Sequence, residues 1–196
     1  HCVFSSCAIR GTRVGLAIYA KDGGVFEAVS FSNITIETRG ARGVEWPIFV
    51  DLEKRDEDSR QSRVRDIHFS DIIVHTGGRV LAGGMPGQPL ENFTFRNLLV
   101  RVTGQSAVAK IRKPRGSSRV RPAGPEQDYG SVPAALIFAN LRGLALRDVR
   151  VVWDTEGVSE DWHALYAAEV EDLRVEGFSG RQASPQGGLA AIGLDS

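Results

Sequence analysis

The sequence has few cysteines and no excess of charge of either sign. Only two of its 196 residues are cysteine, too few for a disulfide framework. Lys and Arg number 24, as do Asp and Glu, so the net charge is zero. A neutral chain lacks the basic field of a nucleic-acid binder, and we expect no nucleic-acid partner. No apolar run approaches the roughly 18 residues of a membrane span, so we expect no span either.

Motifs for the common catalytic and cofactor sites are also missing. The sequence contains no phosphate-binding glycine loop, no nucleophile elbow and no histidine cluster with metal-ligand spacing. Asp56, Glu57 and Asp58 could bind calcium through their carboxylates, but cations surround them and no calcium-loop spacing is present. We therefore expect neither a metal nor a cofactor.

What the sequence does contain is one apolar phrase that recurs along the chain. It reads "VSFSNITIET" from residue 29, "IHFSDIIVHT" from 67, "FTFRNLLVRV" from 93 and "LALRDVRVVW" from 144. Each half alternates between apolar and other residues, which is the pattern of a β-strand. In the middle, Asn33, Asp71, Asn97 or Asp148 marks a change of phase, where a small polar side chain can bond the local backbone through a bend.

Further copies extend the repeat toward both ends of the chain. Residues 2–9 form an opening copy and residues 173–178 a weaker closing one, and a second apolar strand such as "PIFVDL" precedes each rung. The pattern predicts an all-β fold: a right-handed parallel β-helix solenoid of about six rungs, with three short strands per rung and an internal ladder of Asn and Asp. A leucine-rich repeat fits less well, since its Asn falls one place later. We expect one domain over 1–196, with long loops near 52–63 and 110–131.

The opening copy makes two further predictions. Cys2 and Cys7 fall at inward positions, which favours buried free thiols over a disulfide. No capping segment precedes Phe4, so we expect the N-terminal end to be truncated and the natural protein to continue upstream.

Function is expected where the repeat is interrupted. "GLAIYAKDGG" ends in a turn that carries Lys21 and Asp22, which could border a groove or could be an ordinary polar turn. Trp46, before Pro47, is an aromatic at the start of a strand. The basic stretch at 109–130 would suit an anionic polysaccharide such as a uronic-acid polymer, or is a solvated surface loop.

The stretch "GTRVGLAIYAKDGGVFEAVSFSNITIE" resembles glycoside hydrolase family 28, the polygalacturonase- and rhamnogalacturonase-like enzymes of the pectin-lyase-like β-helix superfamily. It is similar to the segment that follows their Gly-His-Gly motif, so the chain resembles the C-terminal portion. Gly15, Leu16 and Ile18 match, whereas the family's substrate-binding Arg and Lys fall on Ala17 and Tyr19. Lys21 could supply a cation from a shifted position. The family's carboxylate motifs lie before this segment and do not occur in residues 1–14.

The resemblance implies a carbohydrate-active protein. The leading expectation is part of a glycoside hydrolase that cleaves pectin-like polysaccharide by acid/base hydrolysis, with the catalytic carboxylates upstream of this chain. Its partner would be a polysaccharide or oligosaccharide, and the family implies a secreted or periplasmic location. The catalytic residues are not identified, and the substrate-binding candidates are Tyr19, Lys21, Asp22 and Trp46. The alternatives are a polysaccharide lyase on the same fold and a non-catalytic carbohydrate-binding or adhesive solenoid.

Overall fold

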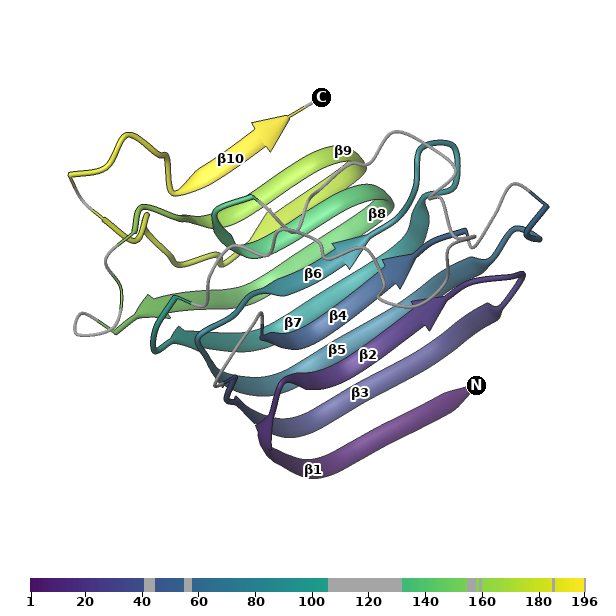
Figure 1. Cartoon of the computed structure of the whole chain (residues 1–196), viewed down its shortest axis with the longest axis horizontal. Helices are drawn as coiled ribbons and strands as arrows, with labels where there is room; N and C mark the ends of the chain where they lie inside the picture. The colour runs from purple at the N-terminus through teal and green to yellow at the C-terminus, as the bar shows by residue number, and fades with distance from the viewer. Residues whose placement is uncertain are drawn as a thin grey trace, which may run out of the picture.

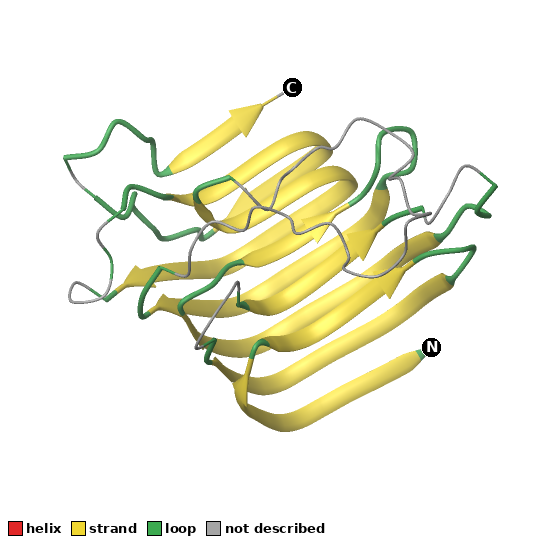
Figure 2. Cartoon of the chain, in the orientation of Figure 1, coloured by secondary structure: helices red, strands yellow, loops and turns green. Residues whose placement is uncertain are grey.

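The computed structural model describes residues 1–40, 45–54, 58–105, 132–154, 158, 160–184 and 186–195. Within these ranges every assigned element is a strand, as the alternating sequence predicts (Figure 2). The strands are β1 (Cys2–Thr12), β2 (Val14–Ala20), β3 (Val25–Thr38), β4 (Trp46–Leu52), β5 (Arg63–Thr76), β6 (Val80–Gly83), β7 (Leu90–Val102), β8 (Ala134–Trp153), β9 (His163–Glu176) and β10 (Ile192–Asp195).

These strands form one sheet in which the named strands pair in parallel. Its main path runs β1-β3-β5-β7-β8-β6-β4-β2, with β9 paired to β8 and β10 paired to β9 (Figure 1). The first half of β8 pairs with β6 and its second half pairs with β7, so this single strand joins the two walls of the sheet. The eight strands of the main path thereby enclose one apolar core in a nearly closed, barrel-like arrangement.

The prediction of a multi-rung right-handed β-helix solenoid is therefore wrong, although the all-β class is correct. The expected rungs of three short strands are not found: the recurring phrases lie within long strands, which reach 20 residues in β8. The phrase marks a bend within a strand rather than its end, because the backbone pairing with both neighbours continues through it. The sheet consequently follows one continuous path around the core.

The predicted stacking of the four phrases is confirmed by the strand register. Ile34 pairs with Ile72, Ile72 with Leu98, and Leu98 with Val149. The same register brings the phenylalanines of β1, β3, β5 and β7 into a ladder of stacked rings, with centroid separations of 5.1, 5.1 and 4.7 Å. Its members are Phe4, Phe31, Phe69 and Phe95. Burial of apolar surface, to which the inner rings of this ladder contribute, is the main favourable contribution to folding.

The bends depend on residues with a left-handed backbone. Asn33, Asp71, Asn97 and Asp148 all have φ between 48° and 57°. Asn and Asp adopt this conformation more readily than other residues with a side chain. A second column of residues with positive φ lies five positions before the first in each strand. Its members are Ala28, Asp66, Asn92, Gly143 and Asp172. The polar ladder is not internal as expected: the Asn97 amide donates to the Asp71 carboxylate at 2.8 Å on the exposed side of the bend.

Strand β1 lies at one end of the sheet path and is largely exposed. Cys2 and Cys7 are free thiols, as expected, but both are exposed rather than buried. They occupy inward positions in register with Val29 and Ile34, yet β3 is the only neighbour that β1 has in the sheet path of the described residues. Phe4 is 51% exposed for the same reason.

A buried carboxylate joins three segments near the start of β4. Glu45 accepts a hydrogen bond from the Thr38 hydroxyl at 2.7 Å, and from the backbone N–H groups of Gly40 at 2.8 Å and Gly77 at 3.1 Å. Hydrogen bonds to a carboxyl group that accepts several donors hold the segments that carry those donors together.

The sequence predicts long loops near 52–63 and 110–131. Strand β4 ends at Leu52 and β5 begins at Arg63, so residues 53–62 connect them, whereas the segment predicted at 110–131 lies outside the described residues.

Within the described part of the chain, no helix has the length and hydropathy that crossing a membrane requires.

Candidate functional site

The candidate site lies on the outer face of β2 and β4, away from the main core. On β2, Leu16, Ile18 and Ala20 are buried, and Tyr19 points to the opposite side. On β4, Ile48, Val50 and Leu52 are buried, which turns Phe49 and Asp51 outward. Because successive side chains of a strand alternate between faces, these outward residues follow directly from the apolar pattern.

Strand register then brings the polar side chains together. Tyr19 pairs with Asp51, and Lys21 and Glu53 lie two positions further along their chains. The Tyr19 hydroxyl donates to Glu53 Oε2 at 2.5 Å, and Lys21 Nζ lies 2.7 Å from the same oxygen. Lys21 Nζ also lies 4.5 Å from the centroid of the Tyr19 ring. We call Tyr19, Lys21, Asp51 and Glu53 the outer-face cluster.

The two carboxyl groups of this cluster titrate differently. Burial raises the pKa of Asp51 to about 7, and the negative charge of Glu53 and a hydrogen bond to it act in the same direction. Protonated Asp51 thus donates to the Glu53 carboxylate. Burial alone would raise the pKa of Glu53 as well, but hydrogen bonds from Lys21 and Tyr19 bring it below its ordinary value. Asp51 therefore loses its proton near neutral pH, whereas Glu53 is already ionised there.

The remaining two members keep their ordinary charge states. Burial, together with the hydrogen bond to Glu53, raises the pKa of Tyr19 to about 12, so its hydroxyl stays protonated. For Lys21, burial acts to lower the pKa, but hydrogen bonds to Glu53 and Tyr19 outweigh it and raise the pKa overall. The Lys21 ammonium group is charged and forms an ion pair with Glu53.

Aromatic and aliphatic side chains adjoin the cluster on the same face. The Phe49 ring lies 6.1 Å from the Tyr19 ring and 5.4 Å from the Trp46 ring, measured between centroids. Trp46 and Phe49 also pack against a small apolar cluster that includes Leu81 and Ile137 from the neighbouring strands. Aromatic faces beside hydrogen-bonding groups suit a ligand that has both apolar and polar surfaces.

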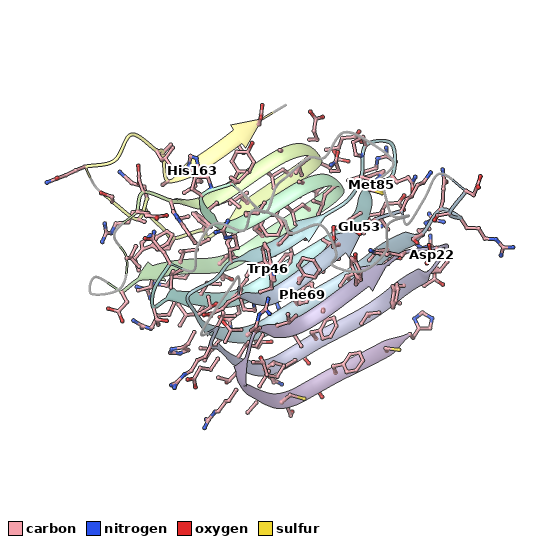
Figure 3. The ribbon with its side chains drawn as sticks, in the orientation of Figure 1. Asp22, Trp46, Glu53, Phe69, Met85 and His163 are labelled. Carbon is pink, nitrogen blue, oxygen red and sulfur yellow. The ribbon has the colours of Figure 1, made fainter. Side chains whose placement is uncertain are left out.

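The structure brings three of the four predicted binding residues close to one another. Tyr19 and Lys21 belong to the cluster, and Trp46 is linked to Tyr19 through Phe49. Asp22 lies in the turn after β2 with φ of 60°, and its carboxylate accepts a hydrogen bond from Ser59. Figure 3 shows Trp46 and Glu53 at the two ends of β4 and Asp22 beyond the end of β2.

Asp51 and Glu53 are the site residues that the sequence analysis missed. In "PIFVDLE" the buried positions alternate, so the Asp and Glu fall on the outward side. The alternation could therefore have identified Asp51 and Glu53 as outward residues. It could not have predicted that β4 pairs with β2, because a segment of irregular length separates Tyr19 from Asp51.

Other candidate residues do not join this site. Asp56 and Glu57 lie outside the described residues, as does the basic stretch from 109 to 130. Across the part of the chain that is described, no group of three or more potential metal-binding side chains is present. Trp153 is buried, and its indole N–H donates to the backbone carbonyl of Arg181 at 2.7 Å.

The two carboxyl groups of the outer-face cluster affect each other's chemistry. The charge of Glu53 and its hydrogen bond with Asp51 both raise the pKa of Asp51, so the two groups titrate as a coupled pair. Their oxygens can exchange hydrogen bonds with the hydroxyl groups of a ligand.

No protein-family model, curated protein or solved structure matches this chain. The resemblance to glycoside hydrolase family 28 therefore stays a prediction.

Proposed function

We propose that this chain is the carbohydrate-binding part of a carbohydrate-active protein of the glycoside hydrolase type. The observation that carries the proposal is the outer-face cluster beside Phe49 and Trp46. Sugar rings offer an apolar face and a rim of hydroxyl groups, and aromatic rings next to fixed hydrogen-bonding groups complement both. Tyr19 is 46% exposed, so its ring remains available to a ligand.

The reaction that we propose is hydrolysis of a pectin-like polysaccharide, because the sequence resembles glycoside hydrolase family 28. Asp51 and Glu53 are assigned a binding role, because the resemblance places the pair of carboxyl groups that flanks the glycosidic bond upstream of this chain. Their hydrogen-bonding capacity would orient the sugar.

The first experiment measures binding of the full chain to a panel of plant polysaccharides by affinity electrophoresis. Replacement of Tyr19 by Ala should weaken binding about tenfold, since a lost aromatic contact is worth about 1 kcal/mol or more. The matched control is Phe26→Ala, because Phe26 is also an aromatic side chain, 38% exposed, but lies on β3. Equal losses in both variants, or no binding to any polysaccharide, would contradict the proposal.

The second experiment identifies the reaction and uses the longer parent protein that the resemblance implies, because the catalytic carboxylates are expected upstream of this chain. New reducing ends without an unsaturated product indicate hydrolysis, whereas an ultraviolet-absorbing unsaturated sugar indicates a lyase. Binding without either product indicates a non-catalytic module. Only the first outcome agrees with the proposed reaction, and the third would leave the binding role and remove the hydrolytic one.

A further inference from the structure

The charge of the outer-face cluster bears on which sugars it can bind. A binding site for uronate residues needs a cation that is free to meet the ligand's carboxylate. Lys21 is the cation of the cluster, and the sequence analysis expected it to have that role. Its ammonium group instead lies 2.7 Å from Glu53 Oε2, and its side chain is only 18% exposed.

Glu53 therefore neutralises Lys21 within the site. The shared oxygen, Oε2, also accepts the Tyr19 hydroxyl, so three side chains are held in one arrangement. Releasing Lys21 for a ligand carboxylate would leave Glu53 without its counter-charge in a partly buried position, which is costly. An anionic ligand gains little from this lysine.

Asp51 adds a second carboxyl group to the same surface. The charged groups that act on it are Glu53 from its own strand and Lys21 from β2. On its other side, β6 places Gly83 in register with it, and a glycine contributes no cation. Further along the same register come Ala139 of β8 and Ala168 of β9. The cluster thus has two carboxyl groups against one ammonium, and its charge is zero or negative.

We propose that the outer-face cluster selects uncharged sugar residues over uronates. This inference rests on the proposed carbohydrate function. Hydroxyl groups of a neutral sugar can donate to the oxygens of Glu53, Asp51 and Tyr19 without any charge conflict. A uronate carboxylate at the same place meets at least one like charge whenever Asp51 is ionised. Within a pectin-like polymer, the matching form is the methyl-esterified one.

The experiment compares two ligands with the same sugar backbone, one carrying carboxylates and the other carrying uncharged methyl esters. Binding of the full chain to polygalacturonate and to its fully methyl-esterified form is measured by isothermal titration calorimetry at low salt and about pH 8, above the pKa of Asp51, so that its carboxylate is ionised. The esterified polymer should bind about tenfold more tightly, the effect expected of one like charge about 6 Å away at an intermediate effective dielectric constant. Added salt should reduce the difference, because it screens the repulsion.

Two variants separate the groups responsible. Asp51→Asn removes one acid and should reduce the preference for the ester, while Glu53→Gln frees Lys21 and should shift the preference toward polygalacturonate. Asp58→Asn, an exposed Asp in the connection after β4, should leave the preference unchanged. Thermal unfolding of each variant verifies that it is folded, and the comparison between the two ligands is made within each protein, so a general loss of affinity does not alter the conclusion.

The outcomes separate this inference from the proposal beneath it. Equal or tighter binding of polygalacturonate by the unmodified chain would overturn the selectivity and leave the carbohydrate function standing. Binding of neither polymer, nor of any neutral polysaccharide, would overturn both.

Discussion

Replacement of Asp51 by Asn should change how the stability of the protein depends on pH. Asp51 has a pKa of about 7 in the folded protein against an ordinary value of 3.8. Folding therefore favours its protonated form, and the free energy of unfolding falls as pH rises from the ordinary pKa through the folded one. Asparagine does not titrate and can keep a hydrogen bond to Glu53, so the variant should lose this pH dependence.

The magnitude follows from the two pKa values. Between about pH 5.5 and about pH 8, the Asp51 term should lower the free energy of unfolding by about 2 kcal/mol. This is an upper value, since Asp51 is partly exposed and solvent screens its charge. Glu53 contributes almost no slope in this window, because its pKa is lowered and it is ionised in both folded and unfolded chains.

Urea denaturation followed by tryptophan fluorescence measures this effect at several pH values in the window. The quantity of interest is the difference between the unmodified chain and Asp51→Asn, in which the histidine contributions cancel. Asp58→Asn is the matched control and should retain the slope of the unmodified chain. Parallel pH profiles for the unmodified chain and Asp51→Asn would refute the assignment of a raised pKa to Asp51.

Three further predictions concern the fold. Phe69→Ala should cost about 3–5 kcal/mol in urea denaturation, since Phe69 is 1% exposed and stacked on both sides, whereas Phe4→Ala at the exposed end should cost under about 1 kcal/mol; equal costs would contradict the ladder. Ala28→Gly should raise the free energy of unfolding by about 1 kcal/mol, because Ala28 has φ of 54°, and Asn33→Ala should lower it by a similar amount. A loss of stability in Ala28→Gly would contradict the strain. Glu45→Ala should lower the thermal midpoint by an amount equivalent to about 2–4 kcal/mol, because four donors, on Thr38, Gly40, Thr76 and Gly77, lose their acceptor; an unchanged midpoint would show that water replaces the carboxylate without cost.

The sequence was informative where a short-range pattern determines the structure. Alternation identified the strands, and the repeated phrase predicted which residues of β3, β5, β7 and β8 lie beside one another. Bends at Asn33 and Asp71 were also indicated, because small polar side chains can bond the local backbone there, but their left-handed backbone was not predicted. Ala28 was missed, since alanine gives no such signal.

Long-range geometry was not predictable from the same pattern. Alternation indicates the inward side of a strand, but not whether the strand ends at a bend or continues through it. In β8 it continues, and the sheet takes a barrel-like path in place of separate solenoid rungs. The burial of Cys2 and Cys7 was mispredicted for a related reason: an inward position buries a side chain only where another strand lies over it.

The candidate site was partly predictable. Tyr19, Lys21 and Trp46 could be named as irregular polar or aromatic residues near strand ends. The role of Lys21 could not, because it depends on the register of β2 with β4, which brings Glu53 to it.

The double pairing of β8 has a consequence for how the molecule opens. Residues 134–141 are buried throughout; they pair with β6 and β9, and at Leu141 the pairing of the same strand with β7 begins. Loss of this strand would separate both walls at once, whereas β1 can detach with little effect on the remainder. Amide hydrogen exchange should therefore be graded, with the fastest exchange in β1 and the slowest in the first half of β8, which would open only when the whole molecule unfolds.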